Sequence, residues 1–288
     1  FGNSMSKVNV NAIEPSTGTD ITLGASGDTI TTPSGAVTSL DGAVTINDSS
    51  NDVDFRVESN GNANMLFVDG GNDRDGIGTN APLSACLLDI RGDGSPAIKL
   101  SDTSSHYVRL GKGYAVGSDE TFFIDNNGSY TMLIDSTGAM TKPLQPAFLC
   151  YNSATDANAT GDGTVVTIDY NTEVFDQNSD FASDTFTAPI TGKYFLQVQV
   201  GLQDTEDATN TRYRMILVTS NRTYVLHEQR VMRQNDGGQD IVLLNGSAVA
   251  DMDASDTAYV QAAVYGGDKV VDIWGNSQPE TFFSGCLL

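Results

Sequence analysis

The feature that most constrains the fold is a strict two-residue alternation that follows the turn Pro189–Gly192. Four apolar residues share one face of the extended chain: Tyr194, Leu196, Val198 and Val200. Gln197 and Gln199 share the opposite face. A period of two predicts a β-strand with one buried face, because a helix would group every third or fourth residue instead.

The same C-terminal stretch begins and ends on apolar runs. Phe148–Tyr151 opens it and Thr281–Leu288 closes it. Free chain ends usually fray unless they are paired, so the two runs are expected to lie in one sheet. The stretch 146–288 therefore predicts one compact β domain.

Composition supports an all-β chain and excludes some partners. The 288 residues are 39% hydrophobic and rich in Gly, Thr, Ser, Asn and Asp, which suits short strands between turns. A net charge of −22 makes nucleic acid and anionic membranes poor partners. The charge suits an exposed protein at high copy or high salt, or reflects solubility alone. No apolar run approaches the roughly 20 residues of a membrane helix, so no membrane insertion is expected.

The N-terminal part, residues 1–52, contains only thin strand-like segments, at 21–24, 29–33 and 43–46. One chain cannot build a core from such strands, whereas three chains around one axis could each supply an apolar side. A flexible low-complexity arm is the alternative.

Residues 53–142 contain an internal repeat. Phe55–Asp69 aligns with Phe122–Asp135, and the Phe, Asn-Gly and Met-Leu positions keep their spacing. Each copy predicts a β-hairpin, because Asn-Gly suits both positive-φ positions of a type I′ turn. Two copies indicate a shaft of stacked β modules, unless the match is a coincidence between two hairpins. Prolines at 143 and 146 then predict an extended hinge, which places the boundary of the C-terminal head at 142/143.

The head, residues 143–288, resembles the globular-head family of complement component 1q, which shares its jelly roll with the tumour necrosis factors. The resemblance rests on the order and spacing of these residues: Pro146-Ala-Phe148, Asn171, Phe186, Gly192-Lys-Tyr194, Ser255-Asp256 and Thr281–Leu288. Leu196 and Cys286 depart from it, since the family usually has aromatic residues there. The resemblance implies a two-sheet jelly roll that assembles as a homotrimer.

The shaft resembles tail fibres of bacterial viruses. The resemblance rests on Lys7–Gly24 and on the sequence Gly76-Ile-Gly-Thr79, which is followed by Pro82. The glycines are expected to allow close backbone approach near a threefold axis. The resemblance implies an N-terminal segment that joins a baseplate, tail or capsid protein, and a head that contacts a glycan or protein on the host surface. It also implies synthesis in the bacterial cytoplasm and location on the virion. A structural decoration or sheath fibre, a bacterial surface adhesin and a glycan-cleaving spike are the alternatives.

No catalytic motif supports an enzyme. His106 and His227 lack metal-ligand spacing, and the chain has neither a Gly-x-Ser-x-Gly elbow nor a phosphate-binding Gly-rich loop. No cofactor is required by this interpretation.

Polar loops between predicted head strands are the candidate binding sites. The predicted receptor-contacting residues are Asp204, Glu206, Asp207, Asn210, Asn221 and Arg222. The predicted calcium ligands are Asp251, Asp253 and Asp256, since oxygen-rich loops suit Ca²⁺. Solvated acidic loops without a ligand are the alternative. Cys150 and Cys286, on strands that are neighbours in the resembled fold, are interpreted as thiols, with a disulfide as the alternative.

Overall fold

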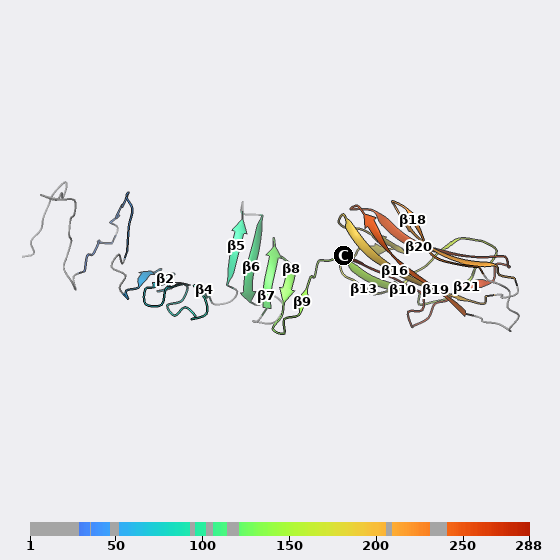
Figure 1. Ribbon diagram of the computed structural model, residues 1–288, viewed down its shortest axis with the longest axis horizontal. Coiled ribbons are helices and arrows are strands. Elements are labelled where there is room, and N and C mark those ends of the chain that lie inside the picture. The colour runs from blue at the N-terminus through green and yellow to red at the C-terminus, as the bar shows by residue number, and fades with distance from the viewer. Residues whose placement is uncertain are drawn as a thin grey trace, which may run out of the picture. The chain divides into compact units, whose positions relative to one another are not determined.

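The computed structural model describes residues 29–34, 36–46, 52–92, 96–101, 106–113, 121–205, 209–230 and 241–288. Every regular element in these residues is a β-strand, which confirms the predicted all-β class (Figure 1). No helix within the described ranges is long and apolar enough to span a membrane. The chain divides into two compact units, residues 1–89 and 90–288.

The N-terminal unit contains the first copy of the repeat. Four strands form one sheet in chain order: β1 (Phe55–Val57), β2 (Leu66–Asp69), β3 (Arg74–Ile77) and β4 (Leu88–Ile90). The described residues at 29–33 and 43–46 form no strand, so the strands predicted there are absent from the single chain. Their apolar side chains have no neighbouring strand to pack on: Ile30, Val44 and Ile46 are exposed.

The first repeat copy is a hairpin, but its turn differs from the prediction. The residues 58–65 form a wide loop instead of a two-residue Asn-Gly turn. Local hydrogen bonds hold this loop, since Ser59 N donates to Asn62 O at 2.8 Å and Asn64 N donates to Asn62 Oδ1 at 2.7 Å. These contacts outcompete the type I′ turn that the Asn-Gly step favours in isolation.

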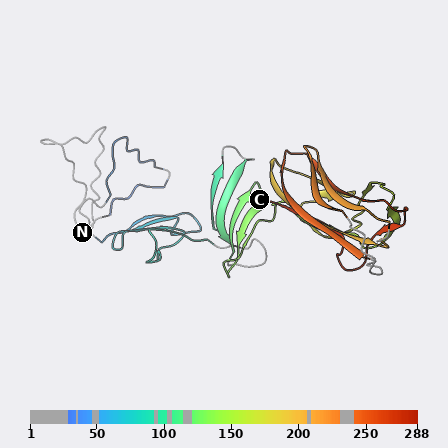
Figure 2. The ribbon, with the colours of Figure 1, turned by 45° about the vertical axis from the view of Figure 1, so that its right-hand side comes forward.

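The second copy matches its prediction. It lies in a five-stranded meander, β5 to β9 (Figure 2). The strands are β5 (Ala97–Ser101), β6 (Tyr107–Gly113), β7 (Thr121–Asn126), β8 (Ser129–Ile134) and β9 (Met140–Thr141). Asn127 and Gly128, between β7 and β8, have φ values of 51° and 88°, the two positive angles of a type I′ turn.

Gly76 is required for a contact within its own chain. A Cβ atom at this position would lie 2.3 Å from the Thr79 carbonyl oxygen. The Gly-Ile-Gly-Thr motif therefore forms a tight local turn, with Gly78 at a φ of 79°. The threefold axis predicted to explain these glycines is not needed to account for Gly76.

The head is an antiparallel sandwich of two sheets. One sheet has the order β11–β21–β16–β22–β10–β13, with β19 on the other edge of β16, and the second has the order β14–β15–β20–β17–β18, with β12 beside β20. The first sheet contains β10 (Ala147–Tyr151), β11 (Asp156–Thr160), β13 (Thr172–Asp176), β16 (Gly192–Gln203), β19 (Ile241–Met252), β21 (Val271–Ile273) and β22 (Phe282–Leu287). The second contains β12 (Val166–Thr167), β14 (Phe181–Ala182), β15 (Thr185–Thr187), β17 (Arg212–Thr219), β18 (Thr223–Arg230) and β20 (Thr257–Tyr265).

The order of these strands is that of a jelly roll. The chain repeatedly crosses from one sheet to the other, so that β10–β22–β16–β19 lies opposite β15–β20–β17–β18. The first and last head strands are neighbours, with Ala147 opposite Cys286 and Tyr151 opposite Phe282. This pairing confirms the prediction drawn from the two apolar ends of the stretch.

The alternation that predicted β16 is present in the core. Tyr194, Leu196, Val198 and Val200 are fully buried between the sheets. Phe148 stacks on Phe186 at a centroid distance of 4.8 Å and meets Phe283 edge-on at 5.0 Å. Burial of these large apolar and aromatic side chains is the main stabilising contribution to the head.

Cys150 and Cys286 are free thiols on adjacent strands. Cys150 points into the core, where its Sγ donates to the Phe283 carbonyl at 3.3 Å, while Cys286 is on the outward face of the same sheet. The two side chains leave opposite faces, so the thiol interpretation holds and the disulfide does not form.

Candidate functional site

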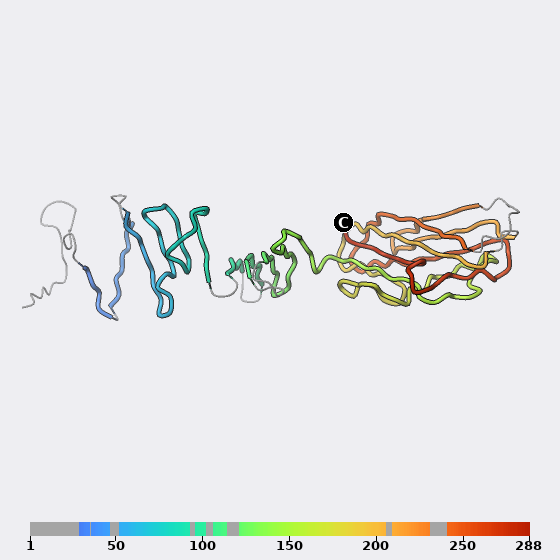
Figure 3. The backbone as a smooth tube through the Cα atoms, turned by 90° about the horizontal axis from the view of Figure 1, so that it is seen from below, coloured from blue at the N-terminus to red at the C-terminus, as the bar shows by residue number. Residues whose placement is uncertain are grey.

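The two ends of the head differ in what they present. At the end that we call the linker end, Leu287 N donates to Pro146 O and Leu288 N donates to Lys193 O. Figure 3 shows the C-terminus beside the incoming chain at this end. The opposite end, called the far end, is where Gln203 pairs with Ile241 and where β17 begins.

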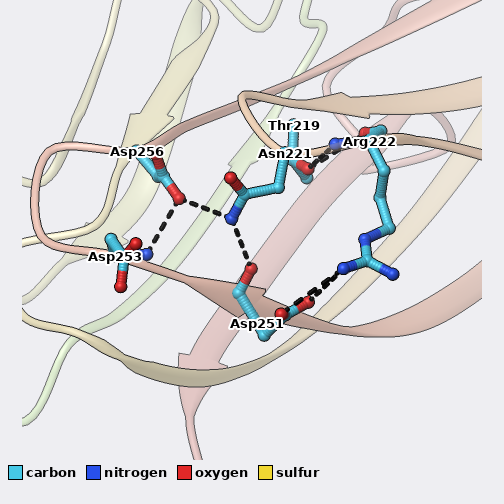
Figure 4. Close-up of polar contacts among 6 residues, drawn as sticks. All are labelled: Thr219, Asn221, Arg222, Asp251, Asp253 and Asp256. Atoms are coloured by element: carbon cyan, nitrogen blue, oxygen red, sulfur yellow. Dashed lines mark hydrogen bonds and ion pairs between the residues drawn. The ribbon is translucent and has the colours of Figure 1, made fainter.

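Two of the predicted loops come together at the linker end (Figure 4). Asn221, in the hairpin tip between β17 and β18, donates through Nδ2 to Asp256 Oδ2 at 2.8 Å and to Asp251 O at 3.0 Å. Asp256 Oδ2 also accepts from Asp253 N at 2.8 Å. Arg222 pairs with Asp251, with 3.2 Å between Nη2 and Oδ1. The hairpin tip and the turn between β19 and β20 thus form one hydrogen-bonded cluster.

This linker-end cluster uses the predicted ligand-binding groups internally. Asn221 and Arg222, predicted to contact a receptor, are exposed and bind a neighbouring turn of their own chain, and receptor contact by them stays a prediction. Among the described residues, no group of three or more His, Cys, Asp or Glu side chains is arranged to hold a metal ion. The carboxylates of Asp251, Asp253 and Asp256 therefore do not converge here, and calcium binding stays an untested prediction.

The other predicted loop leads from β16 to β17 at the far end. Asp204 is exposed and has a φ of 55°. Glu206 and Asp207 lie outside the described residues. Asn210 is only 1% exposed, and its side-chain amide has no hydrogen-bond partner among the residues that the structure describes, so its side chain is not at the surface in this conformation.

The far end also carries a basic hollow that the sequence analysis did not identify. Thr211, Arg212, Arg230 and Tyr265 line an open depression of about 320 Å³. Arg212 begins β17 and lies directly opposite Arg230, the last residue of β18. The only signal for it in the sequence is an arginine at each outer end of a predicted hairpin.

A third feature is the outward face of the seven-stranded sheet. Three consecutive rows of this face contain no charged residue: Ala147–Cys286–Phe195–Val249, Leu149–Ser284–Gln197–Ser247 and Tyr151–Phe282–Gln199–Asn245. At the linker end these rows are bounded by Lys193, which lies opposite Asp251. Phe175 flanks Leu149 on this face and is 49% exposed, and Val249 is 53% exposed. An uncharged, partly aromatic patch of this extent is unusual on a protein with a net charge of −22.

Three partly buried carboxylates, Asp156, Asp169 and Asp184, form one further group. Burial first, and then the nearby charges of Asp184 and Asp156, raise the pKa of Asp169. Burial likewise raises the pKa of Asp156, whose Oδ2 accepts from Asn152 Nδ2 at 3.0 Å. Asp184 Oδ1 accepts from Tyr170 N at 2.8 Å. These contacts fix loops around the core, and Asp156 and Asp184 are both occupied by them.

Comparison with known proteins supports no identification of this chain. No protein-family model matches the sequence, and no curated protein matches it. Among solved structures, murine APRIL at pH 8.5 aligns at 13% identity with a TM-score of 0.34, over 50% of this chain and 99% of that one. The Eiger TNF from S. frugiperda aligns at 14% identity with a TM-score of 0.36, over 50% of this chain and 93% of that one. The jelly-roll assignment rests on the strand order described above.

Proposed function

We propose that this chain is the subunit of a homotrimeric attachment fibre of a bacterial virus. Its N-terminal segment joins a baseplate, tail or capsid protein, and its head contacts a glycan or protein on the host surface. The fibre acts by binding and has no catalytic role. Three heads on each fibre convert weak single contacts into strong adhesion.

The observation that carries the proposal is the group of three uncharged rows on the outward face of the seven-stranded sheet, bounded at the linker end by Lys193 and Asp251. Phe195, Cys286 and Val249 are neighbours in one row of this face. Exposed apolar side chains of this kind mark protein–protein interfaces, and the depletion of charge across the neighbouring Ser, Gln and Asn side chains is typical of an interface centre. The occupant that we propose is the same face of two further copies of this chain.

The shaft modules support the same assembly. Every residue of β5 is exposed in the single chain, including Ile98 at 51% and Leu100 at 62%. In the N-terminal unit Leu66, Val68, Ile77 and Leu88 are exposed as well. Short sheets with an uncovered apolar side need a partner, and parallel copies of the same chain would supply one.

A structural decoration fibre or a bacterial surface adhesin is the second candidate. It is favoured by the linker-end cluster, in which Asn221 and Arg222 are engaged by their own chain. Such a protein would form the same trimer without recognising a virus host. The two candidates therefore differ in host-cell binding and agree in oligomeric state.

The test is adhesion of the purified full chain to a panel of bacterial cells. We expect the trimer to bind its host strain, and a monomeric Val249→Asp variant to bind about 10²–10⁴-fold more weakly, because avidity is lost. Val225→Asp is the matched control, since Val225 is 50% exposed on a strand of the other sheet. A trimer that binds none of the cells would contradict the attachment role and favour the decoration fibre.

A further inference from the structure

In the basic hollow at the far end, two positive charges lie close together without a counter-charge among the described residues. Arg212 and Arg230 are directly opposite each other on antiparallel strands. Like charges in this position repel each other. Neither arginine forms an ion pair with any described carboxylate, although acidic residues outnumber basic ones by 37 to 15 in the chain.

The next residue pair on the same face of this hairpin carries opposite charges. Arg214 is opposite Glu228, and its Nε lies 3.5 Å from Glu228 Oε2. The charge of Arg214 is therefore balanced by the Glu228 carboxylate of the same chain. At the Arg212–Arg230 rung the two guanidinium groups face an open hollow instead.

One of the two guanidinium groups is held in place by packing. The Arg212 guanidinium carbon lies 3.8 Å from the centre of the Tyr265 ring. Thr211 fixes the backbone beside that ring, because Thr211 N donates to Tyr265 O at 2.7 Å and Thr211 Oγ1 donates to it at 3.1 Å. A cation–π contact of this type restricts the orientation of the side chain and leaves its N–H donors for a ligand.

We infer that this hollow binds the oxyanion of an acidic sugar, a carboxylate or phosphate carried on a surface polysaccharide. A planar guanidinium group binds carboxylate and phosphate through paired N–H donors, and two such groups complement one oxyanion. The hollow of about 320 Å³ exceeds a bare oxyanion and leaves room for a sugar ring. The net charge of −22 opposes binding of a densely charged polymer, so the ligand carries isolated acidic units.

The inference deepens the proposed attachment function and rests on it for the source of the sugar. The hollow lies at the far end of the head, opposite the end where the chain from the shaft arrives. Host contact is thereby assigned to Arg212 and Arg230 rather than to Asn221 and Arg222.

Isothermal titration calorimetry of the full chain tests the site, with glucuronate, glucose 6-phosphate, glucose and acetate as ligands. We expect both acidic sugars to bind more tightly than glucose or acetate, and added salt to weaken them. Arg212→Ala and Arg230→Ala should each weaken glucuronate binding by about tenfold or more, since each removes a charge-assisted hydrogen-bond donor. Arg212→Lys should weaken it as well, because lysine keeps the charge and loses the paired donors.

Arg222→Ala is the matched control, since Arg222 is an exposed arginine at the linker end that pairs with Asp251. It should bind glucuronate as the unmodified protein does. The site would be overturned by glucuronate binding no tighter than glucose or acetate, or by equal losses in Arg222→Ala and Arg230→Ala.

Cell adhesion of the same proteins separates this inference from the proposed function. Adhesion that is unchanged in the double variant Arg212→Ala/Arg230→Ala would overturn the assignment of host contact to this hollow and leave the attachment role. Tight glucuronate binding by a protein that adheres to no cell would keep the site and contradict the attachment role.

Discussion

Asn221 and Asp256 are 35 residues apart and joined by a 2.8 Å hydrogen bond from Asn221 Nδ2 to Asp256 Oδ2. This bond ties the β17–β18 hairpin tip to the turn that precedes β20. Two loops that the sequence assigned to different roles, receptor contact and calcium binding, are thus parts of one linker-end cluster. The hydrogen bonds of this cluster join the two loops at the linker end of the head.

The first prediction concerns the stability of this cluster. Asp256→Ala should lower the free energy of unfolding of the head by about 1–3 kcal/mol, because Asp256 Oδ2 accepts from both Asn221 and Asp253 N. Asp253→Ala is the control, since its carboxylate has only a 3.4 Å contact with Thr191. Thermal unfolding of both variants measures the difference, and equal losses would contradict a specific role for Asp256.

The second prediction concerns an ion pair in the β5–β9 sheet. Asp125 is buried, faces Arg109 across the β6–β7 ladder, and accepts from Arg109 Nε at 3.2 Å and Nη2 at 3.1 Å. The hydrogen bond from Arg109 is the main cause that lowers the pKa of Asp125. The ionised Asp125 carboxylate therefore stabilises the folded sheet above its unfolded-state pKa of about 3.9. This stabilisation is lost as the pH falls through the lower pKa that Asp125 has in the folded state.

Asp125→Asn should destabilise this sheet at pH 7 and flatten its loss of stability in acid. The control is Glu58→Gln, because the Arg56–Glu58 pair is half-exposed and such pairs contribute about 0–1 kcal/mol. Denaturant unfolding at several pH values measures both. If Asp125→Asn lost as much stability in acid as the unmodified protein does, the result would contradict the role of ionised Asp125 in this sheet.

The third prediction concerns Asp169, whose effect on stability changes with pH in the opposite direction to that of Asp125. The pKa of Asp169 is raised, mainly by burial, so its favourable contribution is present below the unfolded pKa and is lost as the pH rises through the folded value. Asp169→Asn should therefore raise the Tm of the head at pH 7, and the gain should shrink in acid.

Asp162→Asn provides the matched comparison for Asp169. The hydrogen bonds of Thr164 lower the pKa of Asp162, so this substitution should lower the Tm at pH 7. Calorimetry at pH 7 and pH 4 compares the two. A decrease for Asp169→Asn at pH 7 would show that its charged form is stabilised in the folded head.

The fourth prediction uses the cysteines to report on assembly. Burial raises the pKa of the Cys150 thiol far above its ordinary value, so Cys150 should resist alkylation in every folded form. Cys286 is on the outward face of the seven-stranded sheet and should react in the monomeric Val249→Asp variant. In the trimer it should be protected.

Mass spectrometry after brief alkylation, in a Cys86→Ser background, identifies the modified residue. Equal labelling of Cys286 in the unmodified protein and in Val249→Asp would contradict burial of this face by other copies. Labelling of Cys150 before unfolding would contradict its place in the core.

The head could be predicted from sequence because its pattern is local and periodic. The alternation from Tyr194 to Val200 identified a buried strand face, and the apolar ends identified two neighbouring strands. The hairpin at Asn127-Gly128 was predictable because its turn type depends on only two residues. The same prediction of a two-residue turn was wrong at Asn60-Gly61, because hydrogen bonds to the Ser59 and Asn62 side chains hold a wider loop there.

The far-end site could not be predicted, because it depends on a bulge. Val218 pairs with Thr223, and counting outward from this pair would place Gln229 opposite Arg212. A register shift between Met215 and Ile216 moves Arg230 into that position. Bulges leave little trace in a single sequence, so the paired arginines become visible only in the structure.

The central claim is that three copies of this chain assemble through the outward face of the seven-stranded sheet. Light scattering coupled to size-exclusion chromatography, applied to the full chain and to Val249→Asp and Val225→Asp, tests it most directly. We predict a mass of three times 30.5 kDa for the full chain and for Val225→Asp, and a loss of that trimer in Val249→Asp. A monomeric full chain, or an intact trimer in Val249→Asp, would contradict the claim.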